Sequence, residues 1–479
     1  MPLPKLKVPP GLYRVGTEYE SAGRFYDSNL VRWLDGHLRP IGGWSSLNTG
    51  LTGTARDLHT WVDNSAVGRV AVGTNSNLYV LTNAGARTDI TPVSGWTSQD
   101  AGSSTWTLDN AGQLLVGVND EHGTLFTWLP GDAAAAALSN APSCDAVAVT
   151  NEGIPVALGA SGNPRAIAWC DRDDFTDWTA GFADLAGDLV IQASGTIQNA
   201  KRVRAGLLIW TTSDVHILRY VGLPNVYGVT AVAGGTNAGA VSRHAMVMVG
   251  DLAYWMSDNA FYACSGGAFI SKVRCDIWDD VFAANTNADS NRIVGLNKAQ
   301  AHKVRAMHNA KYSEIWWMYP KGAATENSHV AVYNYAEKTW SIHELVRTCG
   351  IEANHGFESP LMIGSTTLWE HESGDSRTGG GTVYARTGPV ELGDGERQMA
   401  VRRVIPDEGT AGDVDVYFHT RPSPNATEES YGPFVSSNPM DVRFTARQVA
   451  MEFRESSASD WRVGTYRVEM KPAGQGRYG

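Results

Sequence analysis

The sequence predicts an all-β protein whose main body is a β-propeller. Short strand–turn–strand segments recur through the middle of the chain, helix signals are sparse, and the last eighty or so residues alternate between apolar and polar positions. The 479 residues include 51 Gly, 16 Trp and 17 Tyr. Many glycines with many aromatic residues are typical of short strands joined by tight turns.

Seven segments read as hairpins in which Asn, Asp or Ser occupies most of the turns. They are 68–82, 113–128, 204–220, 250–264, 303–320, 329–342 and 359–372. They recur at about 40–50 residues or slightly less, which is the size of a propeller blade. No WD40 or kelch signature recurs among them. We therefore expect a propeller of about six to seven irregular blades over residues 51–385.

Beyond the propeller, residues 386–479 predict a separate β-sandwich-like platform. The segments 413–423, 439–456 and 460–472 alternate with period two, as strands of a half-buried antiparallel sheet do. A Gly- and Ser-rich stretch at 373–400 is interpreted as a linker or long loop. Residues 1–50 are expected to form an arm, with a hairpin at Asp35-Gly36, that packs on the platform.

Two short helices are predicted. Residues 131–141 are rich in alanine, with Asp132 as a possible N-cap. Residues 275–285 carry an apolar stripe after Asp276 and are interpreted as a helix between blades.

The charge and the cysteines exclude several classes of function. The net charge is −11, and residues 46–400 carry −12 of formal charge. This balance disfavours a nucleic-acid reader, although an acidic wall would let DNA slide past. The five cysteines are odd in number and fit no zinc pattern, so we expect buried free thiols. No signal peptide or apolar window of membrane-spanning length is visible, which predicts synthesis in a cytoplasm without membrane insertion.

No catalytic motif is complete. A nucleophile elbow, a P-loop, H-E-x-x-H, an EF-hand loop and a dinucleotide-binding glycine motif in its structural context are all missing. Residues 98–106 resemble one imperfect Asp box of the kind that sialidase propellers repeat, a device that stabilises turns. The acidic segment 171–178 either binds Ca²⁺ or forms an acidic surface turn, and we favour the turn because the EF-hand Gly and Glu are missing.

The remaining candidates are packing residues. The scattered histidines lack the spacing of a metal site, and the aromatic runs 254–255 and 316–319 could stack sugars or bases but more simply fill blade cores. We therefore predict no catalytic residue, no metal and no cofactor.

Arginine is the one residue type that suggests a surface. Residues 401–479 contain nine arginines and one lysine, and arginine favours interfaces and bidentate pairing. The candidate oligomer interface consists of Arg443, Arg447, Arg454, Arg462 and Arg467.

Several stretches together resemble one family. They are 193–224, 249–273, 275–282, 329–345 and 460–472. In order and texture these segments resemble the tail hub, or nozzle, proteins of short-tailed phages, also described as packaged-DNA stabilisation proteins. The resemblance covers about half of the chain.

This resemblance implies a non-enzymatic virion protein of the phage tail, made in the host cytoplasm. It implies a homo-oligomeric ring, usually a hexamer, that lies below the portal and its adaptor ring and closes or extends the DNA channel. The expected partners are the portal-adaptor ring protein, a tail fibre or spike protein, and DNA that passes without sequence recognition. Two alternatives stay open: a carbohydrate-binding or carbohydrate-hydrolysing propeller, and a cytoplasmic scaffold propeller that binds peptides.

Overall fold

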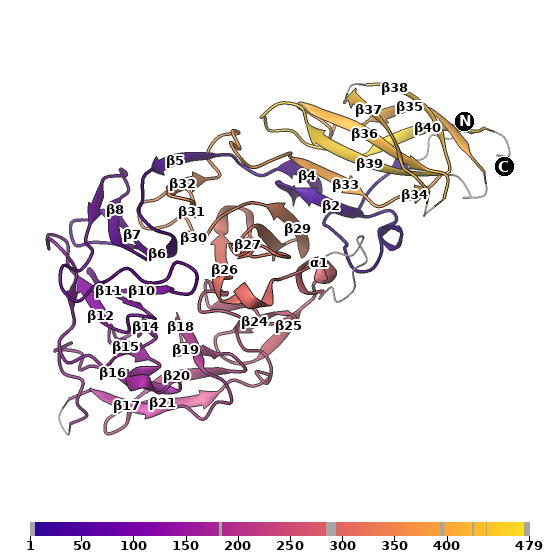
Figure 1. Ribbon diagram of the computed structural model, residues 1–479. Coiled ribbons are helices and arrows are strands. Elements are labelled where there is room, and N and C mark those ends of the chain that lie inside the picture. Colours follow the sequence, from indigo (N-terminus) through magenta and orange to yellow (C-terminus); the bar gives the residue numbers. More distant parts are fainter. Residues whose placement is uncertain are drawn as a thin grey trace.

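The computed structural model describes residues 5–181, 184–283, 294–392, 397–423, 426–436 and 438–473. Within these ranges the chain forms a propeller of seven four-stranded antiparallel sheets and, beside it, a two-layered sandwich (Figure 1). The predicted all-β fold, with a propeller and a C-terminal sandwich, is confirmed.

The blades follow one another along the chain and are numbered here in that order. Blades 1 to 3 consist of β6 (Ala55–Val62), β7 (Gly68–Thr74), β8 (Leu78–Thr82) and β9 (Arg87–Asp89); β10 (Trp106–Ala111), β11 (Leu114–Asn119), β12 (Leu125–Trp128) and β13 (Ala136–Ala137); and β14 (Ala146–Val149), β15 (Pro155–Leu158), β16 (Ala166–Trp169) and β17 (Gly187–Val190). Blades 4 to 6 consist of β18 (Ile197–Val203), β19 (Gly206–Thr211), β20 (Val215–Gly222) and β21 (Val226–Ala231); β22 (Met246–Val249), β23 (Leu252–Met256), β24 (Phe261–Ser265) and β25 (Ile270–Val273); and β26 (Arg305–Asn309), β27 (Glu314–Tyr319), β28 (His329–Asn334) and β29 (Thr339–Glu344).

Blade 7 is built from both sides of the propeller sequence. Its first three strands are β30 (Cys349–Ile351), β31 (Leu361–Gly364) and β32 (Thr367–His371). The fourth is β5 (Trp44–Asn48), which pairs antiparallel with β32 and so closes the ring. This strand lies inside the predicted arm 1–50, so the propeller begins earlier than residue 51.

The hairpin series located the blades unevenly. The segments 303–320 and 329–342 are two halves of a single sheet, blade 6. Blade 3 matched none of the predicted hairpins, because its inner strands read AVAV and PVAL, small apolar runs without aromatic residues or alternation. Two errors of opposite sign therefore left the expected number of blades close to the observed one.

The sandwich contains strands from both ends of the sequence (Figure 1). One sheet has the order β1 (Lys5–Leu6), β40 (Tyr466–Pro472), β35 (Met399–Pro406) and β38 (Met440–Ala446). The other has the order β2 (Phe25–Asn29), β33 (Tyr384–Thr387), β39 (Gln448–Glu455), β36 (Val414–Arg421) and β37 (Glu429–Val435), with β34 (Val390–Glu391) also on β39. Strands β33 and β34 and the start of β35 lie in the stretch 373–400, so that stretch is only partly a linker.

The segment between β2 and β5 joins the two domains. Its hairpin β3 (Val31–Leu34) and β4 (His37–Pro40) turns at Asp35-Gly36, where both residues have positive φ, as the dipeptide predicts. One apolar cluster runs from Phe261 in blade 5 and Trp317 in blade 6 through Trp33 to Phe453 in the sandwich. Propeller and sandwich therefore share a core rather than hang from a flexible linker.

Helical structure is sparse in the described residues. The predicted helix at 275–285 is present as α1 (Trp278–Phe282), although its N-cap is Ile277 and not Asp276. Short 3₁₀ turns are η1 (Tyr19–Ser21), η2 (Ala160–Gly162), η3 (Lys298–Lys303) and η4 (Ala310–Tyr312). The helix predicted at 131–141 is wrong, because residues 136–137 form the outer strand of blade 2.

Candidate functional site

Polar side chains from several blades meet at the propeller axis. A bulge at the start of β6 turns Asp57 toward the axis, where its carboxylate accepts hydrogen bonds from the backbone N–H groups of Leu58 and Leu108, both at 2.9 Å. Arg305 of blade 6 donates to the same carboxylate at 2.7 Å. Burial opposes ionisation of Asp57, but the charge and hydrogen bond of the neighbouring Arg305 hold its pKa below the usual value.

The same arrangement recurs on two other inner strands. Asp109 on β10 accepts from the next residue and from the Val149 N–H of β14 at 2.8 Å, and it pairs with Arg202 of blade 4. Asn199, at a bulge in β18, accepts from the Ala200 N–H and donates to the Arg243 carbonyl ahead of blade 5. These side chains join the inner strand of one blade to the next blade, which identifies them as structural ties.

Other side chains cross the axis. The His244 ring bonds the Trp106 carbonyl of blade 2 at 2.7 Å. Arg243 reaches Asp120, also in blade 2, at 3.4 Å, while donating to the Gln198 carbonyl of blade 4. Burial, with the charge of Arg305, lowers the pKa of His244 to about 3, so the ring is neutral at ordinary pH. Hydrogen bonding between opposite blades therefore occupies the polar groups at the axis.

The imperfect Asp box has a packing role. Trp106 at its end is the first residue of β10, is fully buried, and donates its indole N–H to the Thr74 carbonyl of blade 1 at 2.7 Å. Asp100 accepts from the Gly102 N–H within its own turn. The motif stabilises a loop and offers no aromatic surface to a ligand.

The acidic segment 171–178 also uses its carboxylates locally. Asp171 accepts from the Leu185 N–H at 2.7 Å, and Asp174 accepts from the Thr176 N–H and hydroxyl. Across the described residues no group of three or more His, Cys, Asp or Glu side chains is placed to hold a metal ion. The segment is thus an acidic turn.

The aromatic runs fill the interior. Trp316 and Trp317 are buried, and the Trp317 indole donates to the Ala245 carbonyl at 3.0 Å; Trp255 likewise bonds the Ala238 carbonyl. Tyr254 is half-buried against the ring of Tyr335. The cysteines are all free, and four of the five are buried.

The five candidate arginines do not form one patch. Arg443 on β38 and Arg467 on β40 are exposed on the outer face of the sheet β1-β40-β35-β38. Arg454 on β39 belongs to the other sheet, where it contacts Glu452 and covers the ring of Tyr417. Arg447 lies at the turn between β38 and β39, and the backbone of Arg462 pairs with Ala411.

Two arginines outside the predicted set, Arg402 and Arg403, lie beside Arg443 in a groove of about 810 Å³. The groove crosses the outer face of β35 and β38 and is also lined by Tyr431, Asp441, Thr445 and Glu469. Nothing in the alternation of the sequence marks Arg402 and Arg403, because a bulge between Val401 and Arg403 breaks the period at this point.

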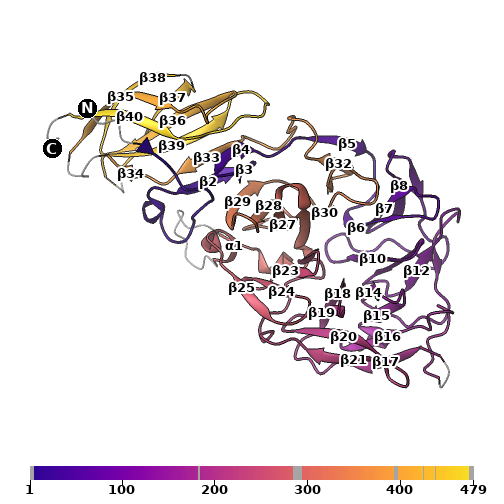
Figure 2. The same ribbon diagram turned by 180° about the vertical axis from the view of Figure 1, so that it is seen from behind.

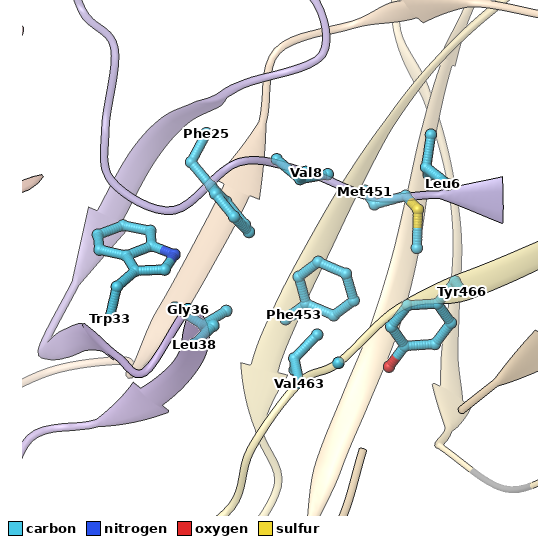
Figure 3. A pocket seen from close by; sticks show the side chains of 11 residues that line it. Leu6, Val8, Phe25, Trp33, Gly36, Leu38, Met451, Phe453, Val463 and Tyr466 are labelled. Carbon is cyan, nitrogen blue, oxygen red and sulfur yellow. The ribbon is translucent and has the colours of Figure 1, made fainter. Parts of the chain in front are cut away.

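A second, much smaller pocket lies between the N-terminal segment and the sandwich (Figure 3). Its cavity of about 30 Å³ is enclosed mainly by apolar side chains such as Phe25, Trp33 and Phe453. This space has room for about one water molecule and for no larger ligand. The pocket is a packing defect of the shared core and not a ligand site.

The fold and these surfaces define a β-propeller protein with an appended β-sandwich. Among solved structures it is similar to virginiamycin B lyase of Staphylococcus aureus (TM-score 0.44, 9% identity, 68% of this chain and 97% of that chain). It is also similar to YCF48 of Cyanidioschyzon merolae (TM-score 0.39, 8% identity, 69% and 98%) and to PorZ of Porphyromonas gingivalis (TM-score 0.40, 10% identity, 75% of this chain). The match spans 44% of the length of PorZ.

No family model matches the chain, and no curated protein matches it. Across the part of the chain that the structure describes, every helix is too short or too polar to span a bilayer.

Proposed function

We propose that this chain is a structural, non-enzymatic tail hub protein of a short-tailed phage, located in the virion tail and made in the host cytoplasm. The observation that carries the structural role is the use of the axial polar groups as ties between blades. Asp57, His244 and Arg305 bond to each other or to backbone groups of other blades, and each is less than a tenth exposed. Groups held in this way stabilise a ring and are poorly placed to meet a substrate.

The proposed role requires a ring of several copies, of which a hexamer is the expected form. Because side chains meet across the axis of a single propeller, DNA would pass through the centre of the ring and not through the propeller itself. The acidic balance of residues 46–400 suits a wall that repels a passing polyanion. The portal-adaptor ring and a fibre or spike protein are the proposed partners.

The test is assembly. The purified chain, measured by mass photometry and negative-stain microscopy, is mixed with the portal-adaptor complex of the phage whose genome encodes it. We expect a ring-shaped additional layer on the adaptor. A chain that never joins the adaptor complex at micromolar concentration would contradict the proposal.

The carbohydrate alternative is tested separately, by screening the protein against sialylated and unmodified glycans for binding and turnover. We expect neither, because the Trp106 indole of the imperfect Asp box is buried and bonded to blade 1. Saturable binding of one glycan would favour the alternative over the tail hub.

A further inference from the structure

Two neighbouring strands of the sandwich are bulged at the same level, and this brings three arginines together. Opposite Arg402 on β35, strand β38 has two residues, Val442 and Arg443, while strand β40 has none between the partners of Val401 and Arg403. Arg443 adopts a φ of +43°, a left-handed conformation that a residue with a Cβ seldom takes within a strand. Bulges re-aim side chains, and strained backbone concentrates at functional positions.

The charges in this groove are only weakly satisfied. Arg403 lies 3.9 Å from Asp441 and 3.8 Å from Glu469, and Arg443 lies 3.8 Å from Asp441, all at the outer limit for an ion pair. The side chain of Arg443 is 80% exposed. Such pairs contribute about 0–1 kcal/mol each, so the guanidinium groups remain available to a partner.

The mixture of charges indicates the class of partner. Three arginines outnumber the two carboxylates, so the groove carries a net positive charge, and the ring of Tyr431 adds an apolar part. An acidic and partly apolar protein surface is therefore the complement of this groove.

This chain has such a surface on blades 3 and 4. The end of β20 and the turn that follows it expose Tyr220, Val221 and Leu223, whose exposed fractions are 47%, 58% and 57%. The ring of Tyr220 packs on Tyr227, at 5.7 Å between centroids, and Tyr227 packs on Trp169 at 5.2 Å. We call this exposed turn the apolar tip; adjacent exposed apolar side chains of this kind mark interaction sites.

Carboxylates lie beside the apolar tip. The acidic turn 171–178 begins two residues after Trp169, and its Asp173 side chain is 84% exposed and lies 3.4 Å from the exposed Arg172. Glu152 accepts a hydrogen bond from the Tyr227 hydroxyl at 3.0 Å, next to the tip. Four aspartates against Arg172 leave the turn 171–178 negatively charged, and packed rings connect Trp169, just before this turn, with the apolar tip.

The groove and the tip cannot meet within one molecule. In both views the sandwich strands β35 and β38 and the propeller strands β17 and β21 lie at opposite ends of the protein (Figures 1 and 2). A contact between them requires a second copy. Because the two surfaces differ, the contact is head to tail and repeats from copy to copy, closing a ring when the rotation permits.

We propose that the groove of Arg402, Arg403 and Arg443 binds the apolar tip and acidic turn of a neighbouring copy of this chain. The inference deepens the proposed function, on which it rests for the role of the ring. The proposed contact has two parts, the arginine groove and the apolar tip with its acidic turn, and each part can be altered by mutation without changing the other.

The first experiment compares self-association by analytical ultracentrifugation. Arg402→Glu/Arg443→Glu and, separately, Val221→Asp should each weaken association at least tenfold. Arg274→Glu is the matched control, because Arg274 is also 80% exposed and lies 2.8 Å from an aspartate, but on blade 5. Asp173→Arg/Asp174→Arg should partly restore association of the arginine variant. Unchanged association of both groove and tip variants would overturn the inference.

The second experiment detects the orientation directly. Val221→Cys on the tip and Thr445→Cys in the groove are prepared separately, each with the native cysteines retained, and then oxidised alone and as a mixture. A head-to-tail contact gives a cross-linked dimer only in the mixture. Cross-linking of either variant with itself, or none in the mixture, would overturn the inference.

The two proposals fail in different ways. If the wild-type protein joins the adaptor complex and the Arg402→Glu/Arg443→Glu variant self-associates and joins it equally well, the groove contact is overturned and the tail hub role stands. Protein that self-associates through the groove yet never joins the adaptor complex supports the contact and refutes the tail hub role.

Discussion

Removal of the Arg32 side chain should destabilise the joint between the propeller and the sandwich. Arg32 on β3 donates to Glu314 of blade 6 at 2.8 Å and 3.0 Å and to Glu372, which follows blade 7, at 2.9 Å and through a second, shorter contact. Its guanidinium also covers the ring of Tyr312 at 3.6 Å. Arg32→Ala removes the shared cation of both carboxylates.

The size of the effect follows from burial. The side chains of Arg32, Glu314 and Glu372 are 4%, 2% and 4% exposed. Breaking one buried ion pair costs about 3–5 kcal/mol, and here two carboxylates lose their counter-charge, so we expect the upper part of that range. Burial raises the pKa of Glu314 even with Arg32 present, so in Arg32→Ala the folded protein should bind a proton that the unfolded chain releases. The destabilisation should therefore be larger at pH 8 than at pH 5.5.

Urea unfolding followed by tryptophan fluorescence measures the effect, since the Trp316 indole bonds Glu314 at 3.0 Å. Wild type, Arg32→Ala and Arg32→Met/Glu314→Gln/Glu372→Gln are compared at both pH values. The triple variant should recover most of the lost stability, because glutamine retains acceptors for the neighbouring donors without a buried charge. A loss below about 1 kcal/mol, or a loss independent of pH, would refute the reasoning.

Three further changes test other parts of the fold. Gly43→Ala should lower the free energy of unfolding in urea by more than about 2 kcal/mol. A Cβ at this position would clash with the Ser376 carbonyl oxygen beside the closing strand β5. An unchanged free energy of unfolding would mean that this strand packs loosely. Asp57→Ala should cost about 3–5 kcal/mol and Asp57→Asn less, since the amide oxygen can still accept one of the two backbone N–H bonds that the carboxylate receives on different oxygens; equal losses would contradict the role of Asp57 as a tie. The Leu30 N–H donates to Nδ1 of His343 at 3.0 Å, and burial lowers the pKa of that ring to about 3. The contribution of the neutral His343 ring to the free energy of unfolding is complete above the unfolded pKa of about 6.5. It is lost at about 1.4 kcal/mol per pH unit as the pH falls toward 3. His343→Gln should therefore flatten the acid side of the plot of stability against pH, and an unchanged plot would refute this.

The recurring hairpins predicted the propeller, but no sequence pattern predicted where the propeller begins and ends. A hairpin can be predicted from its own turn residues, as at Asp35-Gly36, so local sequence patterns located most blades. The partner of a strand distant in sequence leaves no local mark. Nothing in the sequence of Trp44–Asn48 shows that this strand pairs with β32, more than 300 residues later. Blade 3 was not predicted because β14 and β15 carry small side chains without alternation.

The site was predicted less well than the fold. A count of arginines selected residues 443, 447, 454, 462 and 467, but Arg454 lies on β39, which belongs to a different sheet from β38, the strand of Arg443. Arg402 and Arg403 were missed because adjacent residues in a regular strand face opposite sides, and only a bulge lets both be exposed. The axial ties at Asp57 and Asn199 likewise depend on bulges that no periodicity reveals.

The closing strand β5 determines the order in which the molecule can be completed during synthesis. When blades 1 to 6 have left the ribosome, β5 has long been made but has no sheet to join until β32 appears. For that interval the strand is unpaired and open to other chains, including the same strand of a neighbour on one polysome. A chain that lacks β5 would leave the edge of β32 permanently unpaired and should aggregate more readily than the full chain.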